Sequence, residues 1–268
     1  MRVAIAYAVT LAACSFTPPG NAPVDAKVDA PGDANADAPA STRVQAGLVG
    51  FWTFDDANGS TSARDTSGTA SPVPLRVETS PTVFAPTFAN GNVSAPTLGA
   101  RLLSAPNTHL TSDTATAVTL EAWVLPSIAS QGDSAAPKYI AGLAKNVLLR
   151  DIVLLQAGDK WVGRVRTTTN QDGTPSLLST SVASTLAMTH LVLVADATQR
   201  ILYVDDVPEA IGIPGAPMGW DTSHVMALLD EPPHGRQWLG SLALVALYDR
   251  ALSVDEVHQN FMSGPDAP

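Results

Sequence analysis

The chain has 268 residues, which allows one sizeable β domain or two small ones. Hydrophobic residues make up 45% and charged residues only 15%, so the chain can form a core, and its surface relies on uncharged polar side chains. A net charge of −10 disfavours nucleic acid as a partner, and a single cysteine excludes a disulfide within the chain.

Residues 1–13 have the pattern of a bacterial lipoprotein signal peptide. Arg2 supplies a positive charge, and the apolar stretch Val3–Leu11 is too short to span a bilayer as a helix. The next residues, Leu11-Ala12-Ala13-Cys14, resemble a lipobox; the alternatives are an ordinary signal peptide or a buried free cysteine. We expect lipid attachment at Cys14 to anchor the protein in the bacterial cell envelope. Ser15 favours the outer membrane.

Residues 14–42 have the composition of a disordered tether. The segment is rich in Ala, Asp and Pro, and its prolines interrupt any helix. It contains too few large apolar residues to offset the entropy of ordering. Aspartates recur at every fourth position from Asp25 to Asp37, which suits a solvated spacer better than a cation site.

Residues 43–264 alternate short apolar runs with clusters of turn-forming residues, and residues 265–268 form a tail. This alternation predicts an all-β, antiparallel two-sheet sandwich, since no helical pattern separates the runs. The predicted strands are 48–54, 98–103, 118–125, 139–143, 151–155, 161–167, 177–182, 190–196, 201–204, 224–229 and 238–248.

Three segments carry more specific predictions. Residues 190–195 are apolar on both faces, which predicts a central strand covered on both sides. Residues 238–248 are also apolar on both faces, so we expect Leu244 to be covered. After this strand, Ser253 and Glu256 form a capping box, which predicts the start of a short C-terminal helix.

Five segments, in order, resemble the laminin-G-like jelly-roll family of the concanavalin A-like lectin/glucanase superfamily. They are Gly47–Asp56, Asp65–Gly68, Thr119–Val124, His190–Asp205 and Leu247–Ser253. The resemblance covers residues 46–264 and implies a jelly roll with loops at its rim. It implies binding of carbohydrate or protein, although some relatives hydrolyse glycans.

The chain departs from the family pattern at two places. Ala243 and Leu244 replace an acidic pair of the closing strand, and Ala246 replaces a basic residue. The hairpin turn is Asp205-Asp206 where the family commonly has Asp-Gly, so we expect a different turn type.

The resemblance also suggests calcium as a ligand, because several family domains bind it at the rim. Asp55, Asp56 and Asp65, with Asn58, lie on two successive loops and would supply the hard oxygens that calcium prefers. Alternatively, these residues form ordinary turns by bonding to their own backbone. The missing acidic pair at residues 243 and 244 argues against calcium.

Candidate ligand-binding side chains are Arg164, Arg166 and Trp220. The two arginines share one strand face, opposite Trp161, and could hold an acidic sugar or a carboxylate by forked hydrogen bonds. Trp220 and Trp238 could stack on sugars. A solvated sheet face and core tryptophans are the alternatives.

The sequence predicts no catalysis. Glycan hydrolysis needs two carboxylates across the bond, whereas Glu121 is alone on its strand and Asp151 lies at a strand start. None of the five histidines has metal-ligand spacing to another. We therefore predict a binding or adhesion module for carbohydrate or an envelope or extracellular protein. The alternatives are a glycoside hydrolase and a purely structural envelope protein.

Overall fold

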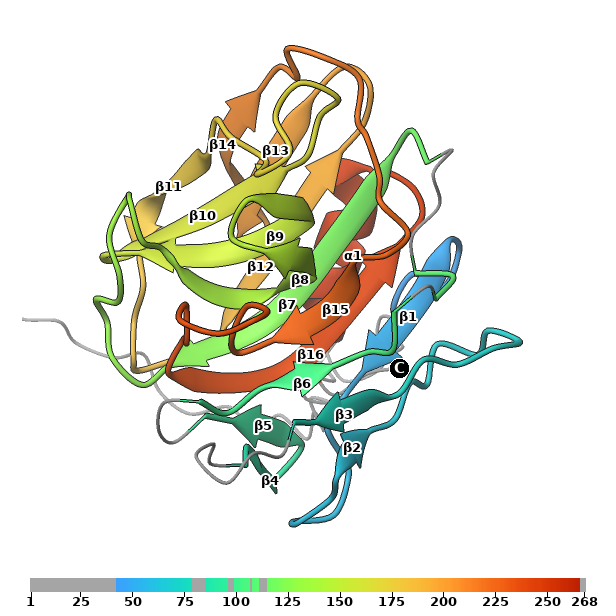
Figure 1. The fold of residues 1–268 in the computed structure, drawn as a ribbon, viewed down its shortest axis with the longest axis vertical. Coiled ribbons are helices and arrows are strands. Elements are labelled where there is room, and N and C mark those ends of the chain that lie inside the picture. Colours follow the sequence, from blue (N-terminus) through green and yellow to red (C-terminus); the bar gives the residue numbers. More distant parts are fainter. Residues whose placement is uncertain (1–41, 79–84, 96–98, 107, 111–114, 266–268) are drawn as a thin grey trace, which may run out of the picture. The chain divides into compact units, whose positions relative to one another are not determined.

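The structure is a computed structural model that describes residues 42–78, 85–95, 99–106, 108–110 and 115–265 (Figure 1). The chain divides into two units, Met1–Pro39 and Ala40–Pro268, and every described element belongs to the second. The predicted signal peptide, Cys14 and the tether up to residue 41 lie outside the described residues, as does the tail from residue 266.

The second unit contains two antiparallel sheets, as the sequence predicts. Sheet A has the order β14 (Val207–Gly212), β13 (Arg200–Val204), β12 (Thr189–Ala195), β7 (Val118–Pro126), β16 (Gly240–Tyr248), β5 (Asn92–Ser94), β4 (Thr87–Ala89), and β1 (Leu48–Trp52) also pairs with β16. Sheet B has the order β11 (Leu177–Val182), β10 (Lys160–Val165), β9 (Leu149–Ala157), β8 (Lys138–Asn146), β15 (Val225–Leu228), β6 (Leu102–Leu103), β3 (Leu75–Val77), β2 (Ser62–Ala63).

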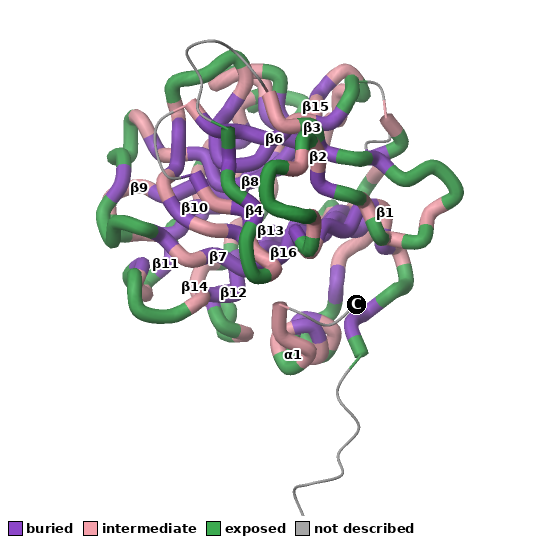
Figure 2. Tube along the Cα trace, turned by 90° about the horizontal axis from the view of Figure 1, so that it is seen from below, coloured by how far each residue is buried: buried purple, intermediate pink, exposed green. Residues whose placement is uncertain are grey.

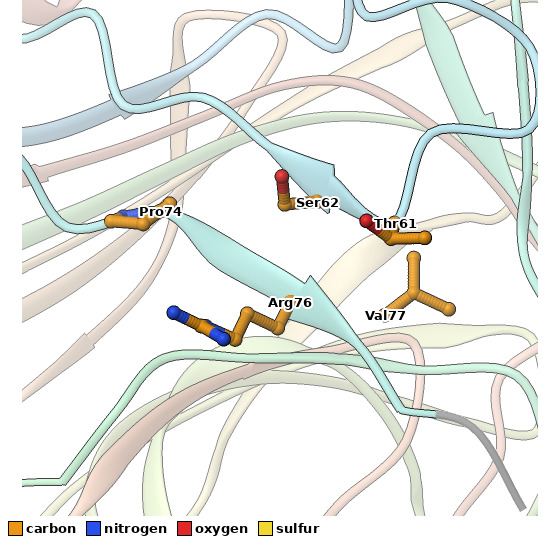
Figure 3. Close-up of a pocket in the computed structure, with 5 residues that line it drawn as sticks. All are labelled: Thr61, Ser62, Pro74, Arg76 and Val77. Carbon is orange, nitrogen blue, oxygen red and sulfur yellow. The ribbon is translucent and has the colours of Figure 1, made fainter.

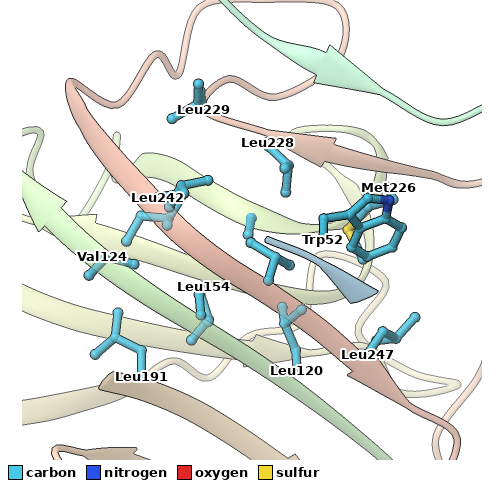
Figure 4. Close-up of a cluster of buried hydrophobic side chains, with 14 of the residues drawn as sticks. Trp52, Leu120, Val124, Leu154, Leu191, Met226, Leu228, Leu229, Leu242 and Leu247 are labelled. Carbon is cyan, nitrogen blue, oxygen red and sulfur yellow. The ribbon is translucent and has the colours of Figure 1, made fainter. Parts of the chain in front are cut away.

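The main core lies between the two sheets (Figure 4). Alternation along β7 sends Leu120 into this core, while Glu121 and Trp123 face the opposite side of sheet A. Figure 2 shows that buried residues follow the strands and that exposed ones gather in the connections. Trp161 and Trp238 are fully buried, so the predicted stacking role of Trp238 is wrong. Its indole instead donates a 2.6 Å hydrogen bond to the side chain of Gln156.

The predicted closing strand and helix are confirmed. Helix α1 (Val254–Ser263) begins at the N-cap Ser253, and both hydrogen bonds of the capping box with Glu256 are present. It packs on the outer face of sheet A, which explains why Leu244 is 0% exposed. All residues of β12 are buried, as expected for a central strand. Among the described residues, no helix is long and apolar enough to cross a membrane.

A buried polar network lies under α1 and joins both ends of the domain to sheet A. Arg43 pairs with Glu121, whose other oxygen accepts a 2.7 Å hydrogen bond from the Asn260 amide. His190 Nε2 lies 2.8 Å from the first oxygen of Glu121. The same Asn260 amide donates to the Tyr248 hydroxyl at 2.9 Å, and its oxygen accepts from the backbone of residue 44. Helix α1 is therefore held by polar contacts as well as by apolar ones.

Two details differ from the sequence predictions. Asp205 and Asp206 take φ values of 48° and 72°, so both have the positive φ that a type I′ turn requires, and the expected change of turn type is wrong. The short strands β2 to β5 and the edge strand β14 were not predicted, because strands of two or three residues carry no periodic signal. In β14, Pro208 and Glu209 interrupt the apolar pattern.

Candidate functional site

The outer face of sheet B is the sheet face that α1 leaves free. An apolar layer lies on it, formed by Tyr139, Ala144, Val153, Leu155, Val162 and Ala227. The β8 residue Tyr139 is 0% exposed, and its backbone N–H donates to the carbonyl of Arg236 in the β15–β16 connection at 2.7 Å. All six residues of the layer are at most 1% exposed, so other parts of the chain cover this part of the face.

A small hollow remains beside β10, where Arg164 lies. It has a volume of about 40 Å³ and is lined by residues of β9, β10, the β7–β8 connection and the start of β11, namely Ser134, Pro137, Ala157, Val162, Arg164, Ser176 and Leu178. Leu178 is 49% exposed at the edge of this hollow. The site thus combines one guanidinium with apolar walls. We call it the Arg164 hollow.

Most hydrogen-bond donors of Arg164 remain available in this hollow. Its Nε donates to the Ser176 hydroxyl at 2.8 Å, and no carboxylate of the described chain lies within 4.0 Å of it. A guanidinium carries five N–H donors, so four have no protein partner among the described residues. Burial lowers the pKa of Arg164, and the positive charge of Arg150 lowers it further, while Asp172 opposes both. A bound anion would offset the two effects, burial and the charge of Arg150, that disfavour the charged form of Arg164.

Arg166, which directly follows β10, is paired with carboxylates and so lacks the free donors of Arg164. Its Nη1 lies 3.3 Å from Asp151 and 3.8 Å from Asp221. Asp151 is also 3.0 Å from the Nδ1 of His224, and both of those groups are buried. Burial raises the pKa of Asp151 despite these partners. The structure therefore places Arg166 in an internal polar cluster, apart from the Arg164 hollow.

Trp220 lies at the end of the sandwich. Its indole N–H donates to the carbonyl of Ala115 at 2.8 Å, and its ring is half-buried against the core. Together with His109 and Leu110 it lines a cleft of about 80 Å³. The three ligand-binding residues expected from the sequence thus do not line one common hollow among those described.

The three predicted calcium ligands have separate local roles. Asp65 accepts hydrogen bonds from three backbone N–H groups, of Phe51, Ser67 and Val73, at 3.1, 2.9 and 2.8 Å. Asp55 accepts one from the hydroxyl of residue 53, and Asp56 pairs with residue 64. In the part of the chain that the structure describes, no group of three or more His, Cys, Asp or Glu could hold a metal ion. Calcium binding stays a prediction.

Carboxylates near the outer face of sheet B are engaged in ion pairs. Glu231 binds Arg150 through two hydrogen bonds, of 2.5 and 2.8 Å, and both side chains are buried. Beside them lies Tyr139, whose hydroxyl has no hydrogen-bond partner in the described structure. Burial raises the pKa of Tyr139, and the charge of Glu231 raises it further. This polar group under the loops was not predicted from the sequence.

A second hollow on sheet B lies at its other end (Figure 3). It is shallow, has a volume of about 410 Å³ and is formed by β2, β3 and adjacent residues, including Ser62, Pro74 and Arg76. Arg76 is exposed and extends from β3 in Figure 3. Leu75 faces the core, and successive side chains of a strand point to opposite faces. The sequence could therefore have placed Arg76 on the outer face.

The fold and these sites can be compared with known proteins. Residues 99–258, more than half of the 268 residues, match the laminin-G-type profile of the concanavalin A-like lectin/glucanases superfamily. The chain belongs to this superfamily. The resemblance seen in the sequence is therefore confirmed. Among curated protein sequences, none matches the chain.

Solved structures of similar fold include a sialidase and a toxin domain. Trypanosoma rangeli sialidase in complex with sialic acid aligns with a TM-score of 0.57 and 17% identity, covering 81% of this chain and 33% of the sialidase. The ligand binding domain of botulinum neurotoxin serotype D in complex with N-acetylneuraminic acid aligns with a TM-score of 0.59 and 9% identity, covering 81% of this chain and 51% of the toxin domain. The chain thus spans between a third and a half of these proteins, and the likeness shows the fold.

Proposed function

We propose that this protein is a non-catalytic carbohydrate-binding module, held at the bacterial cell envelope by a lipid on Cys14, and that the Arg164 hollow binds an acidic sugar. The observation that carries the proposal is the half-buried guanidinium of Arg164, which keeps four donors without a protein partner. The superfamily and the sugar complexes of the two solved structures support carbohydrate as the ligand class.

The chemistry of the hollow suits a sugar that carries a carboxylate. Two parallel N–H donors of a guanidinium match the two oxygens of a carboxylate, and such charge-assisted pairs are stronger than neutral hydrogen bonds. Leu178, which is 49% exposed at the edge of the hollow, provides apolar surface for the C–H groups of the sugar ring. The ligand thus pairs with a charge that the protein leaves unpaired.

The state of the carboxylates supports a non-catalytic role. Hydrolysis needs an acid and a second carboxylate that both reach the glycosidic bond. On the outer face of sheet B, Glu231 and Asp151 are buried and paired with Arg150 and with Arg166 and His224. Neither borders the Arg164 hollow.

The domain is joined to the proposed tether on the side away from this hollow. Arg43, the second described residue, contacts Glu121 on the outer face of sheet A, whereas the hollow lies on the outer face of sheet B. The proposed binding face is therefore remote from the point of attachment.

Isothermal titration calorimetry with galacturonic acid and N-acetylneuraminic acid tests the binding site. Arg164→Ala should weaken binding about tenfold or more, because a hydrogen bond to a charged group contributes about 1.5–3 kcal/mol. Arg164→Lys should weaken it less, since the charge remains and the fork is lost. Lys145→Ala, at an exposed position of β8, is the control. Equal affinities of wild type and Arg164→Ala would reject the site, and release of reducing sugar from a glycan would reject the non-catalytic assignment.

The lipid anchor has its own test. Cys14→Ser removes the thiol to which the lipid would be attached, so the protein should move from the membrane fraction to the soluble fraction. Continued membrane association of Cys14→Ser would reject the anchor without bearing on the sugar site.

A further inference from the structure

A groove lies on the outer face of sheet A, beside the start of α1. Helix α1 covers β7 and β12, where the Phe261 ring packs on Trp123 and His190. Strands β13 and β14 continue sheet A beyond β12 towards its edge. Between β12 and β13 on one side and residues 250–256 on the other, the surface is hollowed by about 560 Å³, more than at the Arg164 hollow. We call it the α1–β13 groove.

Exposed apolar side chains border the groove. Val254, in the first turn of α1, is 56% exposed, and Ile201 on β13 is half-buried; both line the groove. Ile201 pairs with Ile211 on β14, and directly paired residues of antiparallel strands lie on the same face with Cβ atoms about 5 Å apart. Ile211 is 67% exposed, so it extends the apolar surface towards the sheet edge. A contiguous exposed apolar patch of this kind indicates an interaction site.

One carboxylate of the groove has no cationic partner. Oδ1 of Asp196 accepts three hydrogen bonds, from the backbone and the hydroxyl of Thr198 and from the backbone of Gln199, at 2.6, 2.7 and 2.9 Å. Burial raises the pKa of Asp196, but these hydrogen bonds outweigh burial and lower it, so the group is ionised at neutral pH. Its Oδ2 has no hydrogen-bond partner among the described residues and remains available to a cation.

The other charges that line the groove cancel. Arg250 and Glu256 form a bidentate ion pair with N–O distances of 2.7 and 2.8 Å, which leaves the negative charge of Asp196. The Tyr203 hydroxyl makes no hydrogen bond within the described part of the chain. Burial raises the pKa of Tyr203, and the charge of Asp206 raises it further, so the hydroxyl stays protonated and can donate. The groove thus offers a free acceptor and a free donor.

We propose that the α1–β13 groove binds a segment of another protein in which a lysine or an arginine stands beside apolar side chains. The cation pairs with Oδ2 of Asp196, and the apolar side chains cover Ile201, Ile211 and Val254. The groove lies on sheet A and the Arg164 hollow on sheet B, so a bound protein leaves the proposed sugar site free. The proposal therefore does not depend on that site.

Charge selects this occupant over a second copy of the chain and over a lipid surface. In a symmetric dimer the same patch meets itself, which would bring two Asp196 carboxylates together on chains of net charge −10. A membrane surface with anionic lipids is also negative, so it repels an unpaired carboxylate. A basic and apolar protein segment matches both the charge and the apolar surface of the groove.

Peptide display on the whole mature protein tests the proposal. Random twelve-residue peptides are selected on the wild type and, in parallel, on Asp196→Asn and on Ile211→Ser. We expect the wild type to enrich peptides with lysine or arginine beside apolar residues, and neither variant to enrich them. Ile211 is exposed, and Asn forms the same kind of turn as Asp, so both variants should melt like the wild type.

Calorimetry with one synthetic peptide of the selected consensus gives the magnitudes. Ile211→Ser should weaken binding about tenfold, because it removes apolar surface that the peptide buries. Asp196→Asn should bind about threefold more weakly than the wild type at low salt and equally at about 1 M NaCl, since a surface ion pair is weak and screened by salt. Leu148→Ser and Asp159→Asn, at exposed positions next to strands of sheet B, are the matched controls and should bind like the wild type.

The proposal is overturned by no enrichment on the wild type, by enrichment of acidic peptides, or by equal selection on Ile211→Ser. A wild-type dimer that Ile211→Ser converts to a monomer in sedimentation would overturn it in favour of a second copy. Pelleting of Cys14→Ser with phosphatidylglycerol vesicles, abolished by Ile211→Ser, would overturn it in favour of lipid. Arg164→Ala should select the same peptides as the wild type, so failure of the groove and failure of the sugar site are distinguishable.

Discussion

The buried carboxylate of Glu121 should make the stability of the domain depend strongly on pH. The Glu121 side chain is completely buried under α1 and contacts Arg43, His190 and Asn260. Burial alone would raise its pKa, but the hydrogen bond from His190 and the charge of Arg43 outweigh burial and lower the pKa from 4.5 to about 2. This group is ionised in the folded domain well below the pH at which it takes up a proton in the unfolded chain.

The size and the sign of the effect follow from that difference. A shift of one pKa unit corresponds to about 1.4 kcal/mol, so lowering the pKa of Glu121 from 4.5 to about 2 contributes about 3 kcal/mol to the free energy of unfolding. Because the folded pKa is the lower one, this contribution is fully present above about pH 4.5. It is lost progressively as the pH falls from there towards 2.

Glu121→Gln tests this reasoning by urea denaturation at pH 7 and pH 3. Leaving Arg43 buried without its carboxylate should lower the free energy of unfolding by about 3–5 kcal/mol at pH 7. At pH 3 the wild type has itself lost about 2 kcal/mol, so the difference between the two proteins should shrink by that amount. Asp159→Asn, at an exposed turn, is the control and should change stability by less than about 0.5 kcal/mol. An equal difference between wild type and Glu121→Gln at both pH values would refute the reasoning.

Three further substitutions test other features by thermal or urea denaturation. Arg200→Met should raise the free energy of unfolding by about 1 kcal/mol or more, because Arg200 is 3% exposed and has no carboxylate partner among the described residues; a loss of stability would contradict this. Gly142→Ala should lower the free energy of unfolding by at least about 3 kcal/mol, since a Cβ there would lie 2.2 Å from the Ile152 carbonyl oxygen. Gly59→Ala, which has open space around it, should lower it by only about 1 kcal/mol. Asp65→Ala should cost about 2–4 kcal/mol through its three backbone hydrogen bonds, equally in calcium and in EDTA; a loss seen only with calcium would instead indicate a metal ligand.

The long strands and the helix were predictable because their signals are local. The run of apolar residues in β12 and the capping box at Ser253 and Glu256 each specify an element within a few positions. The short strands β2 to β5 were not predictable, since strands of two or three residues are too short to show a periodic pattern.

The candidate site was only partly predictable. Alternation along β10 placed Arg164 on the face opposite Trp161, as the structure confirms. The same alternation could not show that Arg166 meets Asp151 and Asp221, because those partners come from β9 and from the connection before β15. Nor could it show that Trp220 lies at the end of the sandwich, since loop residues have no periodicity.

The sequence by itself determined the class of fold, the order of the main strands and the capped helix, because hydrophobic alternation and capping are properties of neighbouring residues. The tertiary structure alone decided which charges are paired. Arg43 is buried against Glu121, 78 positions away, and Arg164 is left with most of its donors free, although both are arginines of an acidic chain. Pairing depends on distances across sheets and loops, and the availability of a charge for a ligand depends on pairing.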